Sequence, residues 1–257
     1  MQLFIVLVLL IIIISGIYSY YKPRKPLPIP KSSEIENILA IHVEFYQQLS
    51  SSEQLEFLQR VEAFLAAVKV TGVNTVVETI DKVFVAAGAI IPIFAFKNWR
   101  YKNISEVLLY PNSFSKEYQL EGEDRNILGM VGEGALQNTM ILSQQALRNG
   151  FLLPNDKSNT AIHEFVHLFD KSDGDTDGEP EVSVPHQYAQ PWLKRIYQEM
   201  QLINTGRSDI NPYAATNEAE FLAVASEYFF EQPHQMQKKH PELYEALVKI
   251  FHTDVVK

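Results

Sequence analysis

The sequence predicts an α+β fold that is mainly helical, contains a small β-sheet and is preceded by one N-terminal transmembrane helix. Residues 1–21 contain no charged side chain, and segments with helical spacing of apolar residues fill most of the remaining chain. Two short apolar runs, 107–110 and 139–142, have the length and composition of strands. Because helical segments precede, separate and follow these runs, we expect helices packed around a few strands.

The composition limits the chemistry that the chain can perform. Its 257 residues are 46% hydrophobic, which is enough for one sizeable core. No cysteine is present, so disulfides, thiolate metal sites and cysteine nucleophiles are excluded, and any metal must be bound by His, Asp or Glu. The net charge is −9, and no basic patch follows a short N-terminal cluster, so we expect no nucleic-acid partner.

The N-terminal segment is predicted to anchor the chain in a membrane. Residues 3–14 form an unbroken aliphatic and aromatic run, and residues 1–21 together are long enough to span a bilayer core as a helix. Basic side chains follow directly at Lys22, Arg24 and Lys25, and by the positive-inside tendency they place the main domain in the cytoplasm. We therefore expect a single-pass membrane protein.

A cleaved signal peptide is the alternative interpretation of this segment. No lysine or arginine precedes the apolar run, and residues 15–19 form a poor small-residue cleavage site, so we favour the anchor. Prolines between residues 22 and 33 indicate a stiff, extended spacer. The predicted organisation is a transmembrane anchor at 1–21, a linker rich in Pro and Lys at 22–33, and one domain at 34–257.

Periodic apolar residues predict the helices of this domain, and polar caps and prolines predict their ends. The triplet Ser51-Ser52-Glu53 begins one helix, and Pro191 occupies the first turn of another. The apolar stretch 76–96 is long enough to imitate a second membrane span, but its charged side chains and Pro92 favour a buried core helix. The expected helices are 34–50, 51–70, 76–96, 191–203, 219–230 and 241–252.

The pentapeptide His163-Glu164-Phe165-Val166-His167 is the most informative motif in the chain. On a helix, histidines four residues apart lie on one face, so two neutral imidazoles can bind one Zn²⁺. The glutamate beside the first histidine can then act on a zinc-bound water. The structural alternative is a solvated helix face that binds no metal.

The surroundings of the motif favour a buried helix of about four turns. Asp156 or Ser158 can cap its start, and apolar side chains recur through it at helical spacing. Gly174 and Gly178 lie just beyond its expected end. Asp170 can accept a hydrogen bond from a ligand imidazole, and a capping or surface role fits it equally well.

A third ligand is needed, because catalytic zinc sites use three protein ligands and leave one position open. The best candidate is Glu220: Asn217 can cap a helix there, and Glu220 then shares a face with Ala223, Val224 and Glu227. A carboxylate on an apolar helix face needs a partner, which a metal would supply. The alternatives are a surface carboxylate pair, and Glu227 as a partner of the site or as the ligand itself.

Four longer stretches of the chain carry a family resemblance. They are I-H-E-F-V-H-L-F-D at 162–170, D-G-D-T-D-G-E-P at 173–180, N-P-Y-A-A-T-N-E-A-E-F-L-A-V-A-S-E-Y-F-F-E-Q-P at 211–233 and L-L-Y-P-N-S-F at 108–114. On these stretches the chain is similar to the zinc-dependent peptidases typified by Mlc titration factor A, a family related in fold to the lethal-factor type of zincin. The likeness covers about residues 35 to 255 and implies a zincin-like metallopeptidase domain.

The resemblance also implies a role for each residue of the site. His163, His167 and Glu220 would bind one Zn²⁺ per chain, Glu164 would be the catalytic base, and Tyr213 would supply a catalytic or substrate-orienting hydroxyl near the metal. The implied activity is hydrolysis of peptide bonds by a Glu-activated, zinc-bound water, with a peptide or protein as substrate. Endopeptidase and aminopeptidase action both stay open.

A regulatory, protein-binding module with a structural or vestigial zinc site is the alternative function. The name of the family's typifying member refers to titrating a transcriptional repressor, and in this role the chain would have a regulatory protein as its partner. A closed site with four protein ligands would favour the regulatory role, whereas an open site favours catalysis.

The loop at 173–178 imitates the start of an EF-hand calcium loop. Its twelfth position is Val184, where a calcium loop has glutamate, and Pro180 and Pro185 interrupt the helix that should follow, so we expect a solvated turn. The other histidines have no partners at ligand spacing, and only His186 lies near the motif in the sequence.

Overall fold

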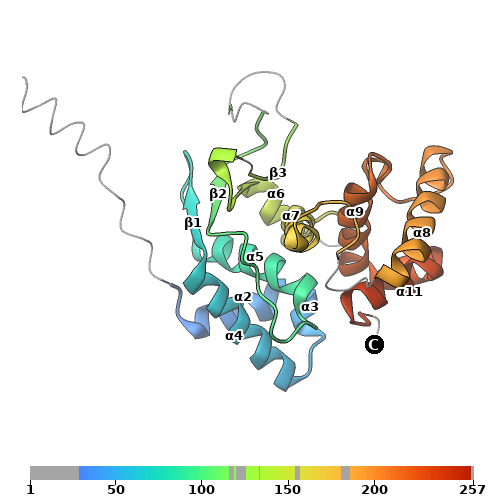
Figure 1. Cartoon of the computed structure of the whole chain (residues 1–257). Coiled ribbons are helices and arrows are strands. Elements are labelled where there is room, and N and C mark those ends of the chain that lie inside the picture. Colours follow the sequence, from blue (N-terminus) through green and yellow to red (C-terminus); the bar gives the residue numbers. More distant parts are fainter. Residues whose placement is uncertain are drawn as a thin grey trace, which may run out of the picture.

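The computed structural model has a mainly helical α+β fold, as the sequence predicts, with a small sheet beside packed helices (Figure 1). The structure describes residues 29–115, 119, 126–132, 134–153, 157–180 and 186–255. The predicted anchor at 1–21 lies outside these residues, as does most of the predicted linker. Within them, no helix is both long enough and apolar enough to cross a membrane. The anchor and its orientation stay predictions.

Helices make up most of the described chain. The α-helices are α2 (Ser32–His42), α3 (Glu44–Gln47), α4 (Ser51–Ala67), α5 (Thr79–Ile90), α6 (Gln144–Leu152), α7 (Thr160–Asp170), α8 (His186–Asn204), α9 (Glu218–Glu231), α10 (Pro233–Lys239) and α11 (Pro241–Phe251). Short 3₁₀ helices are η1 (Ile91–Ile93), η2 (Gly134–Leu136), η3 (Lys171–Asp173) and η4 (Pro212–Ala215). Ser50 and Glu53 form a capping box at the start of α4, which confirms the helix start predicted at Ser51.

The sheet has four strands in the spatial order β1-β2-β4-β3. They are β1 (Lys69–Gly72), β2 (Glu106–Tyr110), β3 (Gly129–Val131) and β4 (Thr139–Ser143). The strands predicted at 107–110 and 139–142 are confirmed as β2 and β4, which run parallel to each other and to β1. β3 runs antiparallel to β4, with Met130 opposite Ile141, and forms the edge of the sheet beside α7.

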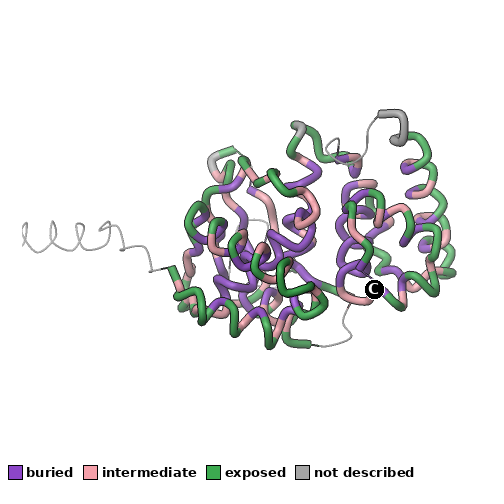
Figure 2. The backbone as a smooth tube through the Cα atoms, turned by 90° about the horizontal axis from the view of Figure 1, so that it is seen from below, coloured by how far each residue is buried: buried purple, intermediate pink, exposed green. Residues whose placement is uncertain are grey.

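The main core lies where α5, α7 and α9 pack together, in the interior that Figure 2 shows as buried backbone. Gly88 of α5 permits a close approach to α7, because a Cβ on Gly88 would lie 2.5 Å from the Cβ of Ala161. The helix that carries the histidine motif is therefore held between two other helices inside the molecule.

Two predicted helices end earlier than expected. The helix predicted at 34–50 is interrupted at Val43, whose backbone is extended (φ −111°, ψ 98°) and whose side chain is buried. The helix predicted at 51–70 stops before residues 69–72, which pair with β2 as strand β1. At residues 69–72, pairing with β2 overrides the local helical period.

Further boundaries also differ from the predictions. The helix predicted at 191–203 is α8, which begins earlier, at His186, and so contains Pro191 in its interior and not in its first turn. The buried core helix predicted at 76–96 is confirmed as α5, but it ends in a 3₁₀ turn that includes Pro92. β1, β3, α6 and α10 were not predicted, because short segments show too few residues to define a period.

Candidate metal centre

The HExxH motif lies on α7, a helix of 11 residues of which nearly all are buried. Its cap is Asn159, whose side-chain oxygen accepts a hydrogen bond from the N–H of Ile162 at 3.2 Å. The predicted cap Ser158 is therefore wrong by one residue, and the other predicted cap, Asp156, lies outside the described residues. The helix has about three turns where four were expected.

Side chains from α7 and α9 converge on one point. Nε2 of His163 lies 3.1 Å from Nε2 of His167 and 3.1 Å from Oε2 of Glu220. Nε2 of His167 lies 3.5 Å from the same carboxylate oxygen. Among the described residues this is the one cluster of three or more side chains with the geometry to hold a metal ion, and its members are the three that the sequence analysis indicated.

The chemistry of this donor set fits a metal ion better than a hydrogen-bond network. Nδ1 of His163 donates to Oε1 of Glu227 at 2.7 Å, so Nε2 of a neutral ring directs a lone pair toward Glu220. An ionised carboxylate has only acceptors, so these lone pairs repel one another unless a cation lies between them. Two imidazoles and one carboxylate leave a fourth position open, as in catalytic zinc sites.

Glu220, and not Glu227, contributes the carboxylate oxygen of the cluster. Both lie on α9, seven residues apart and on one face, as the spacing predicts. Glu227 contacts the opposite ring nitrogen of His163, and its second oxygen accepts a hydrogen bond from the N–H of Asn159 at 2.6 Å. It therefore orients the imidazole and selects the tautomer with the proton on Nδ1.

The same contacts shift the pKa values of His163 and Glu220. Burial alone would lower the pKa of His163, but hydrogen bonds to Glu220 and Glu227 outweigh burial and raise it well above its usual value. Burial would raise the pKa of Glu220, but the two histidines lower it far below its usual range. In the absence of a metal, a proton on Nε2 of His163 lies between this nitrogen and the carboxylate of Glu220. A metal that binds here displaces that proton.

Glu164 is buried beside the cluster, against the edge strand β3. A Cβ on Gly129 would lie 2.6 Å from Oε1 of Glu164, so any side chain at this position would displace the carboxylate or the strand. Burial raises the pKa of Glu164, and the nearby His163 and His167 offset part of the rise. A buried carboxylate with raised proton affinity next to a metal cluster is well placed for proton transfer.

Tyr213 lies at the rim of the cluster, on η4. Its ring stacks on that of His163, with the ring centroids 6.2 Å apart and the planes at 30°. The side-chain oxygen of Asn211 accepts a hydrogen bond from the Tyr213 N–H at 3.0 Å and holds this turn. Burial and the neighbouring carboxylate of Glu220 raise the pKa of Tyr213 to about 12, so its hydroxyl remains a donor at neutral pH.

Asp170 holds the loop after α7. Its Oδ2 accepts a hydrogen bond from the N–H of Gly178 at 2.8 Å, in the loop, and it makes no side-chain cap bond to η3. The side chain is buried, so neither the capping role nor the surface role considered for it is confirmed. Nδ1 of His167 has no hydrogen-bond partner among the described residues, so Asp170 does not orient this imidazole. The glycines expected past the helix end adopt positive φ values, 119° at Gly174 and 79° at Gly178.

Some candidate residues lie outside the part of the chain that the structure describes, and the sequence analysis missed two supporting residues. Val184, which decided against a calcium loop, and the side chain of His186 lie outside the described residues. Asn159 was missed because its role depends on Glu227, 68 residues further along the chain. Gly129 was missed because its strand was not predicted, and a lone glycine in a loop-like sequence gives no signal.

A family model described as glucose-regulated metallo-peptidase M90 matches residues 22–252. An uncharacterized protein of Synechocystis sp. is 29% identical over 96% of this chain and 95% of that protein. Mlc titration factor A of Salmonella arizonae is 26% identical over 84% of this chain and 89% of that protein. The protein of the same name from Pectobacterium atrosepticum is 29% identical over 58% of this chain and 59% of its own length. The chain belongs to the glucose-regulated metallo-peptidase M90 family, which confirms the resemblance found in the sequence.

Proposed function

We propose that this member of the M90 family is a zinc-dependent peptidase, with His163, His167 and Glu220 as metal ligands and Glu164 as general base. The observation that carries the proposal is the convergence of one ligand atom from each of the three within 4.8 Å of one another, beside a buried glutamate. Zinc is the proposed metal, because two imidazoles and one carboxylate are a typical ligand set of catalytic zinc. Membership of a metallopeptidase family supports this choice.

The proposed reaction assigns each side chain a separate task. The chemistry that bound zinc supplies is polarisation of a carbonyl oxygen and activation of water near neutral pH. Glu164 accepts the proton of the attacking water and passes it to the leaving amine, a role that its raised pKa supports. Tyr213 donates a hydrogen bond to the oxygen that becomes negative in the transition state. Glu227 keeps Nε2 of His163 available.

The proposed substrate is a peptide in an extended conformation. β3 is the edge strand of the described sheet, and its Gly129 packs against Glu164. A peptide that adds to this edge through main-chain hydrogen bonds passes directly beside Glu164. Such pairing recognises the backbone of the substrate, so the preference for particular side chains depends on neighbouring pockets.

Metal content and peptide cleavage, measured together on the full chain, test the proposal. We expect one zinc per chain and chelator-sensitive cleavage of short peptides by the parent. Glu164→Gln should retain zinc and lose nearly all turnover, whereas His163→Ala should lose both metal and turnover. Parental turnover in Glu164→Gln would contradict the mechanism, and a chain that binds no zinc would overturn the proposed ligands.

A regulatory role is the second candidate, because relatives carry the name Mlc titration factor A. In this role the chain binds a regulatory protein and its zinc is structural. One zinc per chain without turnover of any peptide in a broad library would favour this role over catalysis.

We also propose that residues 1–21 anchor the chain in a membrane, with the domain at 34–257 on the cytoplasmic side. Fractionation of cells with alkaline extraction tests the anchor, and protease protection in vesicles of known orientation tests the direction. Recovery of the full chain in the soluble fraction would contradict the anchor.

A further inference from the structure

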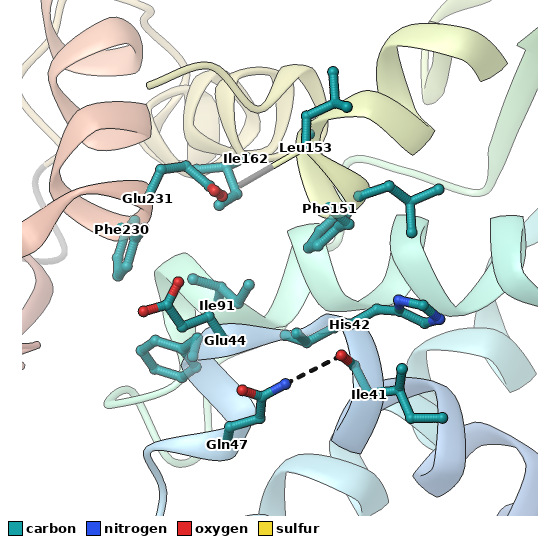
Figure 3. Close-up of a pocket in the computed structure, with 14 residues that line it drawn as sticks. Ile41, His42, Glu44, Gln47, Ile91, Phe151, Leu153, Ile162, Phe230 and Glu231 are labelled. Carbon is teal, nitrogen blue, oxygen red and sulfur yellow. Dashed lines mark hydrogen bonds between the residues drawn. The ribbon is translucent and has the colours of Figure 1, made fainter. Parts of the chain in front are cut away.

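A cavity of about 390 Å³ lies behind the first turn of α7. Figure 3 shows it between side chains of α2 and α3 on one side and of α6, α7 and α9 on the other. None of the proposed ligands lines it, although its wall includes Ile162, the residue directly before His163. Its volume falls within the range of small-molecule sites, about 300 to 1,000 Å³.

Large apolar side chains, some buried and some exposed, form part of the wall of this cavity. Ile91, Ile162 and Phe230 are buried side chains of its wall. Ile41 is 58% exposed, Leu152 42% and Leu153 50%, and all three line the cavity. Large apolar side chains that line a cavity and are exposed to solvent are typical of a binding site.

The charged groups of the cavity select the sign of its ligand. Glu44 of α3 and Glu231 of α9 line it, and none of the described residues of the lining is a lysine or arginine. Figure 3 shows both acidic side chains on the side of the cavity where Ile91 lies, with Glu231 above Ile91 and Glu44 beside it. A ligand with an apolar body and a cationic group complements this lining, and an anionic ligand is repelled by it.

We propose that this cavity binds a small organic cation with an apolar body, such as an arylalkylamine, and that its occupancy is coupled to the metal centre. The apolar body packs against Ile41, Leu152 and Leu153, the exposed apolar side chains of the lining, and the ammonium group lies at Glu44 and Glu231.

The coupling follows a continuous series of hydrogen bonds from Glu231 to His163. Oε1 of Glu231 accepts from the side-chain amide of Asn159 at 2.9 Å, and the same amide donates to the carbonyl of Gly150, which also lines the cavity. The Asn159 N–H then binds Glu227, and Glu227 binds Nδ1 of His163. A cation that draws the Glu231 carboxylate into the cavity weakens its bond to Asn159 and loosens the support of His163. Ligand and zinc therefore oppose each other's binding.

Binding itself is tested on the metal-free full chain by NMR titration with 2-phenylethylammonium, 2-phenylethanol and 3-phenylpropanoate. The cation should bind at least about fivefold more tightly than the neutral and anionic probes. Glu231→Gln keeps an oxygen for Asn159 and should reduce this preference, because only the charge of Glu44 remains. Ile41→Arg should weaken the binding of the cation. Its matched control Leu55→Arg, at a residue of similar exposure (56%), should leave this binding unchanged. Equal binding of the three probes, or parental binding by Ile41→Arg, would overturn the site.

The coupling between the cavity and the metal centre rests on the proposed function, and it is measured separately from binding. The affinity for the cation is measured with and without zinc, and the affinity for zinc with and without saturating cation. Both should fall, and by the same factor, because coupling between two sites is reciprocal. Unchanged affinities in both titrations would refute the coupling. A chain that binds the cation but no zinc would refute the proposed function and leave the cavity site intact.

Discussion

Glu227 on α9 holds His163 on α7 through a hydrogen bond of 2.7 Å between Oε1 and Nδ1. Its second oxygen accepts the N–H of Asn159, the residue that caps α7. One buried carboxylate therefore fixes the orientation of a proposed ligand and the start of the helix that carries it.

Glu227→Gln is expected to weaken zinc binding by a factor of about 10 to 100, the usual effect of removing a carboxylate that orients a ligand histidine. Glutamine keeps one acceptor oxygen, but its NH₂ group faces a donor, either His163 or Asn159. A competition titration with a zinc indicator measures the change. Glu218→Gln, at a half-buried glutamate of the same helix that accepts a hydrogen bond from Tyr197, is the control and should bind zinc like the parent. Equal affinity in both variants would remove Glu227 from the site.

Tyr213→Phe is expected to retain zinc and to lower kcat about 100-fold, with a small effect on KM. The hydroxyl of Tyr213 stays protonated at neutral pH, since its pKa is raised to about 12. The hydrogen bond that this hydroxyl donates stabilises the transition state and not the bound substrate. Steady-state kinetics with a short peptide measure the loss. Tyr197→Phe is a matched control, because Tyr197 is 51% exposed and Tyr213 is 52% exposed. A change in KM alone would assign Tyr213 to substrate binding.

Gly129→Ala is expected to lower turnover while zinc remains bound. The added methyl would lie 2.6 Å from Oε1 of Glu164 and 2.8 Å from the side chain of Thr160, so the carboxylate or the strand must shift. Gly134→Ala provides the comparison: nothing lies within 4 Å of its added methyl, but its positive φ makes the change strained. Turnover and thermal unfolding are measured for both. If the two variants lose turnover in proportion to stability, the close approach at Glu164 is not the cause.

The helical framework and the three proposed ligands were accessible from the sequence because their signals are local. The two histidines and Glu164 lie within one helical turn and a half, and Glu220 lies on a periodic helix with Asn217 as its cap, which the structure confirms. Such features depend on residues three to seven positions apart, and helical spacing places them on one face regardless of the fold.

The remaining features depend on contacts between distant segments. The helix predicted at 51–70 includes Lys69 and Val70, and only the pairing of residues 69–72 with β2 makes this segment a strand. Gly129 acquires its role from the approach of β3 to Glu164, and Asn159 from a glutamate on α9. The contact of Glu227 with Nδ1 of His163, opposite the ring nitrogen that faces Glu220, likewise depends on the fold.

An ion-pair network around Asp209 joins segments on both sides of the site. Its carboxylate accepts hydrogen bonds from Lys157 at 2.5 Å, from Lys239 at 2.7 Å and from His240 at 2.7 Å. Lys157 lies just before α7, and Asp209 lies just before η4, which carries Tyr213. Burial would raise the pKa of Asp209, but these hydrogen bonds outweigh burial and lower it well below its usual value.

The lowered pKa of Asp209 predicts how stability depends on pH. A carboxylate whose pKa is lower in the folded chain stabilises the fold above its unfolded pKa, about 4, and loses this contribution as pH falls below that value. Asp209→Asn should therefore cost about 1 to 2 kcal/mol of unfolding free energy at pH 7, a range that allows for the 29% exposure of the carboxylate to solvent. The difference between variant and parent should shrink at about pH 3, because there the carboxylate of the unfolded chain takes up a proton while that of the folded chain stays ionised. Urea unfolding at both pH values measures it, with Asp177→Asn in an exposed loop as control. A difference that stays constant between the two pH values would show that the network does not depend on the charge of Asp209.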